Sequence, residues 1–112
     1  MKQGYVYIMS NKSRTTFYIG VTSNIERRVW EHKSREGSAF TTKYQCFDLS
    51  YYEHFWGMAD AIRREKQLKN WHRDWKINLI KQENPEMKDL ALDWFKDYSL
   101  EGNVVKLRVA EN

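Results

Sequence analysis

Two short runs near the start of the chain decide the fold: Tyr5-Val-Tyr-Ile-Met9 and Thr16-Phe-Tyr-Ile-Gly20. Both are rich in aromatic and β-branched residues, which favour strands, and a polar stretch over residues 10–15 separates them. This arrangement predicts an antiparallel β-hairpin with a loop of medium length. The aromatic and partly alternating run Cys46–Phe55 predicts a third strand.

Helical patterns occupy most of the remaining chain. Ser23 followed three residues later by Glu26 is typical of a capping box, so a helix is predicted from there to about Lys33. Residues 35–42 contain Gly and Ser and predict a loop. Three further helical segments are predicted beyond Gly57: Met58–Leu68, Trp71–Gln82 and a short amphipathic stretch over Asp89–Tyr98.

In this order the elements predict an α+β fold, a small three-stranded antiparallel β-sheet flanked by helices, with a ββαβαα core and a C-terminal helical segment. The last core helix is expected to end near Asn84-Pro85, because the residue before a proline disfavours helical backbone. We therefore expect one domain over residues 1–85 and an acidic extension over residues 86–112 that packs on the domain or trails from it.

Composition narrows the class of protein. Of the 112 residues, 41% are hydrophobic and 30% are charged, as in a soluble globular domain. The apolar runs fall far short of the roughly 20 residues that cross a bilayer, and Val6–Met9 is too short for the apolar region of a signal peptide. The single cysteine, Cys46, excludes an internal disulfide and a cysteine-based zinc site, and it suits a reducing cytoplasm.

Charge is distributed unevenly along the chain. Residues 1–82 carry fifteen Lys and Arg against eight Asp and Glu, a net charge of +7. Residues 83–112 carry four against seven, a net charge of −3. A basic body with an acidic tail is typical of a polyanion-binding domain. The alternative interpretation is the ordinary asymmetry of a solvated surface.

Glu65 is the residue that least fits its surroundings. It falls on the apolar stripe that Met58, Ala61, Ile62 and Leu68 define along the predicted helix. A carboxylate that faces the core is costly unless it is paired or coordinated. Two interpretations follow. In one, the carboxylate lies at the edge of the stripe and bridges to an arginine; in the other, it projects into a cleft and holds a divalent metal ion.

Two further sets of side chains carry potential chemistry. Arg28 and His32 lie one turn apart on the first predicted helix, where a guanidinium can bind phosphate through two donors and an imidazole can move a proton. Tyr7 and Tyr18 place phenols on the two strands of the predicted hairpin. Taken singly, each pattern is more typical of a solvated helix face or of core packing.

Taken together, these residues resemble the GIY-YIG endonuclease domain. The resemblance rests on segments that keep the spacing of the family: Tyr5-Val6-Tyr7, Tyr18-Ile19-Gly20, Arg28, His32 and Ala61-Ile-Arg-Arg-Glu65-Lys-Gln-Leu-Lys69. The stretches Phe40–Tyr44, Tyr51–Glu53, Trp75–Ile80 and Asn84–Leu90 extend it. It covers roughly residues 4–92 and points to the small, single-domain bacterial branch of the family. One departure is that Tyr5 replaces the first motif's glycine, with Gly4 displaced by one position.

The resemblance implies hydrolysis of phosphodiester bonds in nucleic acid with a divalent cation, Mg²⁺ or Mn²⁺. It identifies the catalytic residues as the motif tyrosines, the catalytic arginine, the helix histidine and the metal ligand: Tyr7, Tyr18, Arg28, His32 and Glu65. In addition, the loop residue Lys43 or Tyr44 is expected to contribute. Either Asn70 or Asn78 is the counterpart of an asparagine that the family often carries on a later helix.

The general base is left open between Tyr7 and His32. A phenol has a reference pKa of about 10, so Tyr7 needs nearby positive charge to favour its phenolate form. Arg28, His32, Lys43 and the bound cation are the expected sources of that charge. His32 is the alternative proton acceptor.

Basic residues are expected to contact the phosphates of the nucleic acid: Arg27, Lys43, Arg63, Arg64, Lys66 and Lys69. The alternative for those on the predicted helix is a solvated face. We expect DNA rather than RNA, no membrane association, and a role in repair or recombination. The first alternative function is a non-catalytic or partner-dependent nucleic-acid-binding module. The second is a protein-interaction domain, which would expose an apolar patch of Leu92, Trp94 and Phe95.

Overall fold

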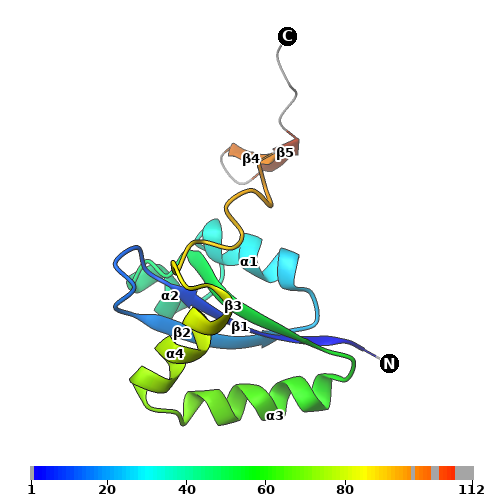
Figure 1. Ribbon diagram of the computed structural model, residues 1–112. Coiled ribbons are helices and arrows are strands. Elements are labelled where there is room, and N and C mark those ends of the chain that lie inside the picture. Colours follow the sequence, from blue (N-terminus) through cyan, green and yellow to red (C-terminus); the bar gives the residue numbers. More distant parts are fainter. Residues whose placement is uncertain (1, 97, 102–103, 108–112) are drawn as a thin grey trace.

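The computed structural model describes residues 2–96, 98–101 and 104–107. Within these ranges the three strands of one sheet are β1 (Gly4–Ser10), β2 (Phe17–Thr22) and β3 (Asp48–Phe55). The helices are α1 (Ile25–Lys33), α2 (Ala39–Lys43), α3 (Met58–Lys69) and α4 (Arg73–Glu83). Two further strands, β4 (Tyr98–Glu101) and β5 (Val104–Leu107), pair as a separate hairpin, which lies apart from the sheet in Figure 1.

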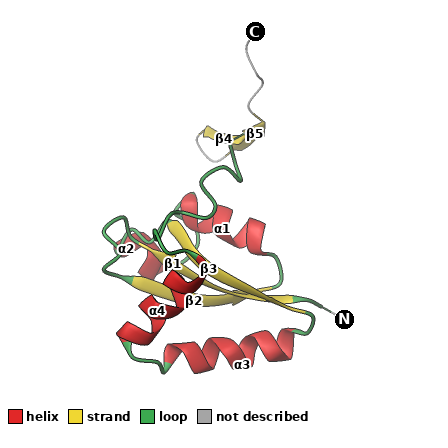
Figure 2. Cartoon of the chain, viewed as in Figure 1, coloured by secondary structure: helices red, strands yellow, loops and turns green. Residues whose placement is uncertain are grey.

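The first strand of the chain is the central strand of the sheet. The strand order is β2-β1-β3, and β1 runs antiparallel to both neighbours. In this register Tyr7 of β1 lies opposite Gly20 of β2 and Tyr52 of β3. Figure 2 shows helices on both sides of the sheet. Because side chains alternate along a strand, β1 supplies the core residues of both faces.

The two faces of the sheet pack against different helices. On one face, Val6 and Ile8 are fully buried and pack with Leu68 of α3. On the other face, Tyr7 is buried and packs with Val29 of α1. Figure 1 shows α1 and α3 on opposite sides of the sheet. Each helix therefore closes its own hydrophobic cluster, and each cluster includes a buried tyrosine, Tyr51 on the α3 face and Tyr7 on the α1 face.

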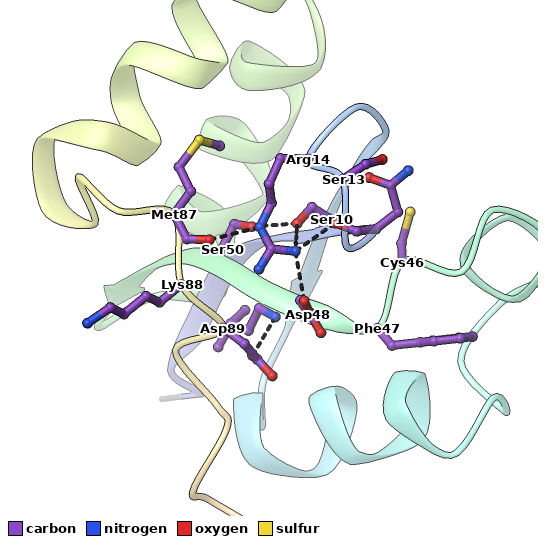
Figure 3. A network of polar contacts seen from close by, with 12 residues as sticks. Ser10, Ser13, Arg14, Cys46, Phe47, Asp48, Ser50, Met87, Lys88 and Asp89 are labelled. Atoms are coloured by element: carbon purple, nitrogen blue, oxygen red, sulfur yellow. Dashed lines mark hydrogen bonds and ion pairs between the residues drawn. The ribbon is translucent and has the colours of Figure 1, made fainter.

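A polar network ties residues beyond α4 to the end of the sheet (Figure 3). The Arg14 guanidinium donates hydrogen bonds to the carbonyl of Met87 at 2.8 Å and to the carboxylate of Asp48 at 2.7 Å. The carboxylate of Asp89 accepts from the backbone N–H of Leu49 at 2.9 Å. This part of the predicted extension therefore packs on the domain through the start of β3.

The predicted α+β class, with its three-stranded antiparallel sheet and flanking helices, is confirmed. Two local predictions near the first helix are wrong. Asn24 caps α1 rather than Ser23, because its side chain accepts a hydrogen bond from the N–H of Arg27 at 3.1 Å. The predicted loop over residues 35–42 contains the start of α2, which Ser38 caps.

The predicted C-terminal helical segment is also wrong within the described residues. Residues 90–96 form turns, since the carboxylate of Asp89 accepts the N–H groups of Leu49 and Ala91 and holds the chain in a non-helical path. Residues 97, 102–103 and 108–112 of the predicted extension lie outside the described part of the chain. The division of the chain at residue 85 stays a prediction. In the described ranges, no helix is long and apolar enough to cross a membrane.

Candidate active site

Four of the five predicted catalytic side chains meet on the α1 face of the sheet. The phenol oxygen of Tyr7 lies 2.9 Å from Nε2 of His32, and Nε of Arg28 donates to the same oxygen at 3.3 Å. The ring of Tyr18 lies against the ring of His32, with 5.4 Å between centroids. The two phenols lie on neighbouring strands and share a face of the sheet, and Arg28 and His32 share a helix face one turn apart. The local periodicities therefore bring the four side chains together.

Gly20 is required for this arrangement. It lies opposite Tyr7 in the register, and a Cβ atom at this position would be 2.4 Å from the phenol oxygen. That distance is well inside van der Waals contact, so any other residue would push the ring of Tyr7 away from His32. The glycine of the second motif thus makes space for the tyrosine of the first.

Burial decides the protonation of the Tyr7 and His32 pair. Burial raises the pKa of the Tyr7 phenol, and the hydrogen bond from Arg28 only partly opposes this. Burial, assisted by the positive charge of Arg28, lowers the pKa of His32 to about 4. At neutral pH the phenol is therefore protonated and the imidazole is neutral. The expectation that nearby positive charge favours a Tyr7 phenolate is wrong for the free protein, because desolvation outweighs that charge.

Arg28 is the charged member of the cluster and remains partly exposed, with a side-chain exposed fraction of 27%. Burial acts to lower its pKa, but hydrogen bonds to Tyr7 and Glu31 outweigh burial and raise it. The contact from Nη1 to the Glu31 carboxylate is 3.4 Å, long for an ion pair that donates a hydrogen bond. The guanidinium therefore keeps donors that an incoming phosphate oxygen can take.

Glu65 lies on a helix, α3, that covers the other face of the sheet from the one that carries Tyr7. Its side chain is 15% exposed, and its carboxylate pairs with Nζ of Lys69 at 3.1 Å. Among the described residues, no hydrogen bond or ion pair joins Glu65 to Tyr7 or Arg28. The interpretation without a metal ion expects Glu65 to bridge to an arginine. The structure instead shows Lys69, one turn along the same helix, as its partner.

The predicted phosphate-binding residues on α3 are largely engaged within the protein. Arg64 forms an ion pair with Glu53 at 2.9 Å, and its guanidinium lies 5.1 Å from the ring centroid of Trp71. Arg63 pairs with Asp60 at 2.8 Å. Lys69 pairs with Glu65 at 3.1 Å. The remaining three predicted contacts are exposed to solvent: Arg27, Lys43 and Lys66. These exposed residues are better placed to contact phosphates than the paired arginines.

The predicted apolar patch near the C-terminal end is divided by packing. Leu92 has an exposed fraction of 74%, whereas Trp94 and Phe95 pack against the α1 cluster. The ring of Phe95 lies 5.1 Å from that of Trp30, and the ring of Trp94 lies 5.7 Å from that of Tyr52. The continuous patch expected for a protein-interaction domain is therefore absent at these three positions.

Sequence reasoning missed the residues that surround the far side of His32. Nδ1 of His32 lies 3.1 Å from Oγ1 of Thr41, and a Cβ atom at Gly37 would be 2.1 Å from the same nitrogen. Both residues belong to the segment that was predicted as a loop. Thr41 lies within the stretch Phe40–Tyr44 that resembles the family, which was the only signal in the sequence.

Comparisons with known proteins place this site in a family. The family model described as the GIY-YIG catalytic domain matches residues 3–78. The chain belongs to the GIY-YIG family. GIY-YIG domains form a nuclease superfamily, and they bind nucleic acid in general. The resemblance that the motifs indicated is thereby confirmed, and the matched range contains Tyr7, Tyr18, Arg28, His32 and Glu65.

Relatives of this GIY-YIG domain are small proteins that match over almost their whole length. The UPF0213 protein of Syntrophus aciditrophicus is 38% identical over 87 residues, which cover 77% of this chain and 98% of the relative. A UPF0213 protein of Staphylococcus haemolyticus is 33% identical over 82 residues, which cover 73% and 99%. The solution NMR structure of a UPF0213 protein from Bacillus halodurans matches with a TM-score of 0.50 and 28% identity, covering 81% of this chain and 97% of that one.

Proposed function

We propose that the protein is a metal-dependent endonuclease that hydrolyses phosphodiester bonds in nucleic acid, with DNA as the expected substrate and repair or recombination as the expected setting. The observation that carries the proposal is the buried hydrogen bond between Tyr7 and His32 beside the partly exposed Arg28 guanidinium. Burying a phenol and an imidazole costs free energy unless the two groups are hydrogen-bonded. Here they are hydrogen-bonded to each other, and they lie beside a guanidinium, a group that can bind phosphate. Membership of the GIY-YIG nuclease family supports the same proposal.

Arg28 is the proposed phosphate ligand. Its planar guanidinium offers several donors in a fixed geometry, which matches the non-bridging oxygens of a phosphodiester better than a lysine ammonium does. One donor is fixed on Tyr7, and the contact to Glu31 is long enough to be exchanged for a phosphate oxygen. Negative charge that develops on phosphorus during hydrolysis would then be neutralised at the cluster. Tyr18 is proposed to position the attacking water or the phosphate.

Tyr7 and His32 are the proposed path for the proton of the attacking water. Because the phenol is protonated and the imidazole is neutral, the water gives its proton to the Tyr7 oxygen while the phenol proton moves to Nε2 of His32. The water oxygen forms a bond to phosphorus, and the bond from phosphorus to the leaving oxygen breaks with its electron pair on that oxygen. The imidazolium returns its proton through Tyr7 afterwards, which its pKa of about 4 favours.

Glu65 is the proposed metal ligand. Mg²⁺ is commonly bound through one or two carboxylates together with substrate phosphates and water, so a single half-buried carboxylate fits this ion. When bound, the cation would stabilise negative charge on the phosphate and the leaving oxygen. The carboxylate must first exchange its contact with Lys69 for the ion.

The position of Glu65 also favours a second candidate function, a non-catalytic or partner-dependent nucleic-acid-binding module. Its helix packs on the face opposite to Tyr7, and its carboxylate is paired with Lys69. In this alternative, Arg28 and the exposed basic residues hold nucleic acid, and a partner protein supplies targeting or completes the chemistry.

A cleavage assay separates the two candidates. The full chain is incubated with single-stranded, duplex, flapped and branched DNA, and with matched RNA, in Mg²⁺, in Mn²⁺ or in a chelator. Glu65→Gln is compared with Glu83→Gln, which changes an exposed carboxylate on α4 and serves as the matched control. We expect cleavage that requires the metal, falls by at least about 100-fold in Glu65→Gln and is retained in Glu83→Gln.

The outcomes of this assay are distinct. Cleavage that continues in the chelator, or that is equal in both variants, would contradict the metal-dependent role of Glu65. Binding that weakens steeply with salt, without cleavage of any substrate, would support the binding module instead.

A further inference from the structure

His32 is completely enclosed, and hydroxyl groups contact both of its ring nitrogens. Its exposed fraction is 0%, Nε2 lies 2.9 Å from the Tyr7 oxygen, and Nδ1 lies 3.1 Å from Oγ1 of Thr41. The turn between α1 and α2 closes over the ring so tightly that only glycine fits at position 37. A neutral imidazole carries its proton on one nitrogen, and the hydrogen bond at the other nitrogen selects which one.

The contacts of Thr41 indicate that its hydroxyl oxygen accepts a hydrogen bond from His32. Oγ1 of Thr41 donates to the carbonyl oxygen of Ser38 at 3.3 Å, an atom that can only accept. The hydroxyl of Ser38 lies 2.9 Å from the same Oγ1 and can donate to it. Thr41 has a single hydroxyl proton and the Ser38 carbonyl can only accept one, so we assign the proton to that contact, which leaves the lone pairs of Oγ1 for donors. The donor that faces them is Nδ1–H of His32.

The contacts of Tyr7 give the same answer from the other side of the ring. Arg28 has no acceptor atom, so its contact with the Tyr7 oxygen makes that oxygen an acceptor. The phenol proton then has Nε2 of His32 as its partner at 2.9 Å. A single chain of hydrogen bonds results, in which Arg28 donates to Tyr7, Tyr7 to His32, His32 to Thr41, and Thr41 to the carbonyl of Ser38.

We infer that Thr41 is a positioning residue. By accepting a hydrogen bond from Nδ1–H, it holds His32 in the tautomer whose Nε2 can take the phenol proton of Tyr7. The opposite tautomer would direct an N–H toward a phenol oxygen that already accepts from Arg28, and the proton path would be blocked. This inference deepens the proposed nuclease function and depends on it for its catalytic meaning. The tautomer itself is a property of the folded protein and does not depend on activity.

The direct test is the ring-nitrogen spectrum of His32 in the full chain, recorded by ¹⁵N-edited NMR at neutral pH. Wild type is expected to show a protonated Nδ1 and an unprotonated Nε2 for this residue, assigned by comparison with His32→Gln. A protonated Nε2 in wild type would overturn the inference without any further variant. This measurement also decides the question if a substitution at Thr41 fails to fold.

Two substitutions at the same position then separate the hydroxyl from its packing. Thr41→Ser keeps the acceptor and is expected to keep the wild-type tautomer. Thr41→Val keeps the shape but removes the acceptor, and it is expected to shift His32 toward the Nε2–H form or a mixture of both. Thr42→Val is the matched control, since it makes the same change at the next, exposed threonine, whose hydroxyl donates to the carbonyl of Arg35 and does not contact His32. An unchanged tautomer in folded Thr41→Val would overturn the inference.

Cleavage kinetics test whether Thr41 also affects the rate of the reaction. If the protein cleaves nucleic acid as proposed, Thr41→Val should lower kcat by about 100-fold, the low end of what a positioned proton acceptor contributes. KM should stay within a few-fold, and Thr41→Ser should restore kcat. A wild-type protein with the expected tautomer but without cleavage would contradict the proposed function and leave the role of Thr41 in holding His32 intact. Normal kcat in a Thr41→Val protein with a shifted tautomer would contradict the catalytic meaning alone.

Discussion

The two faces of the sheet are built from alternate residues of the same strand, yet they differ in what they bury. The α3 face buries Val6 and Ile8 of β1 against Leu68, and the buried phenol on this face, Tyr51, donates to the partly exposed carboxylate of Glu53 at 2.6 Å. The α1 face buries Tyr7 of the same strand against His32, through a hydrogen bond of 2.9 Å. Among the described residues, no buried side-chain nitrogen or oxygen lacks a hydrogen-bond partner. The α1 face thus tolerates a buried polar cluster because every polar atom is satisfied.

This difference indicates that the two faces have different roles. The α3 face supplies stability through hydrophobic burial, whereas the α1 face holds groups that are suited to proton transfer and phosphate binding. If the roles differ in this way, substitutions on the two faces should affect different measurements.

The largest expected effect comes from removing the charged group of the α1 face. Arg28→Ala should lower the rate of nucleic-acid cleavage by about 1000-fold, because the charge that develops on phosphorus loses its guanidinium partner. The free energy of unfolding should change by less than about 1 kcal/mol, since Arg28 is partly exposed. Single-turnover cleavage and urea denaturation measure the two quantities. Lys81→Ala on α4 is the control for a lost positive charge, and equal rates in the two variants would contradict the account.

A substitution on the α3 face should lower stability and leave the cleavage rate nearly unchanged. Leu68→Ala removes a fully buried side chain and should lower the free energy of unfolding by about 2–5 kcal/mol. Its cleavage rate per folded molecule should stay within a few-fold of wild type. Denaturant titration gives the stability, and the assay is run below the unfolding transition. A large loss of rate in the folded variant would show that the two faces are not separable.

Acid should destabilise the α1 face through His32. The folded pKa of about 4 lies below the reference value of about 6.5, so the unfolded chain binds a proton first as pH falls. Stability from this residue is complete above about pH 6.5 and is lost as pH falls toward 4, by up to about 3 kcal/mol. His32→Gln cannot titrate, so its stability should depend less on pH in this window. Parallel slopes for wild type and variant in denaturation at several pH values would contradict the prediction.

A smaller effect is expected from the glycine that makes room for Tyr7. Gly20→Ala places a Cβ atom 2.4 Å from the phenol oxygen and should lower the free energy of unfolding by about 2 kcal/mol. It should also lower the cleavage rate, because the ring must move away from His32. Thr22→Ala, two residues along the same strand, is the control. Unchanged stability and rate in Gly20→Ala would show that the close contact is not required.

Much of the fold could be predicted from local pattern, because the strands alternate and the helices repeat over short distances. The same is true of part of the cluster: Arg28 and His32 are one turn apart on a helix, and the two tyrosines lie on the two strands of the predicted hairpin. Thr41 could not be placed, since its contact with His32 depends on how the turn after α1 closes. The turns after residue 89 were missed for a similar reason, because Asp89 is fixed by the N–H of Leu49, forty positions earlier.

The position of Glu65 shows a further limit of sequence reasoning. Periodicity correctly placed this carboxylate on a half-buried part of its helix, and the family resemblance assigned it to the metal. Periodicity could not show that α3 covers the face opposite to Tyr7, because the side of a sheet on which a helix packs depends on tertiary structure.

The most direct test of the central claim is single-turnover cleavage by Tyr7→Phe in the presence of Mg²⁺. This substitution removes one oxygen atom and keeps the ring that packs beneath α1. It leaves Nε2 of His32 without its partner, so we expect a folded protein whose free energy of unfolding is about 1–3 kcal/mol lower. We expect a rate at least about 100-fold below that of wild type, because the proton path from water to His32 is interrupted. Cleavage at the wild-type rate by folded Tyr7→Phe would contradict the assignment of the α1 face as the active site.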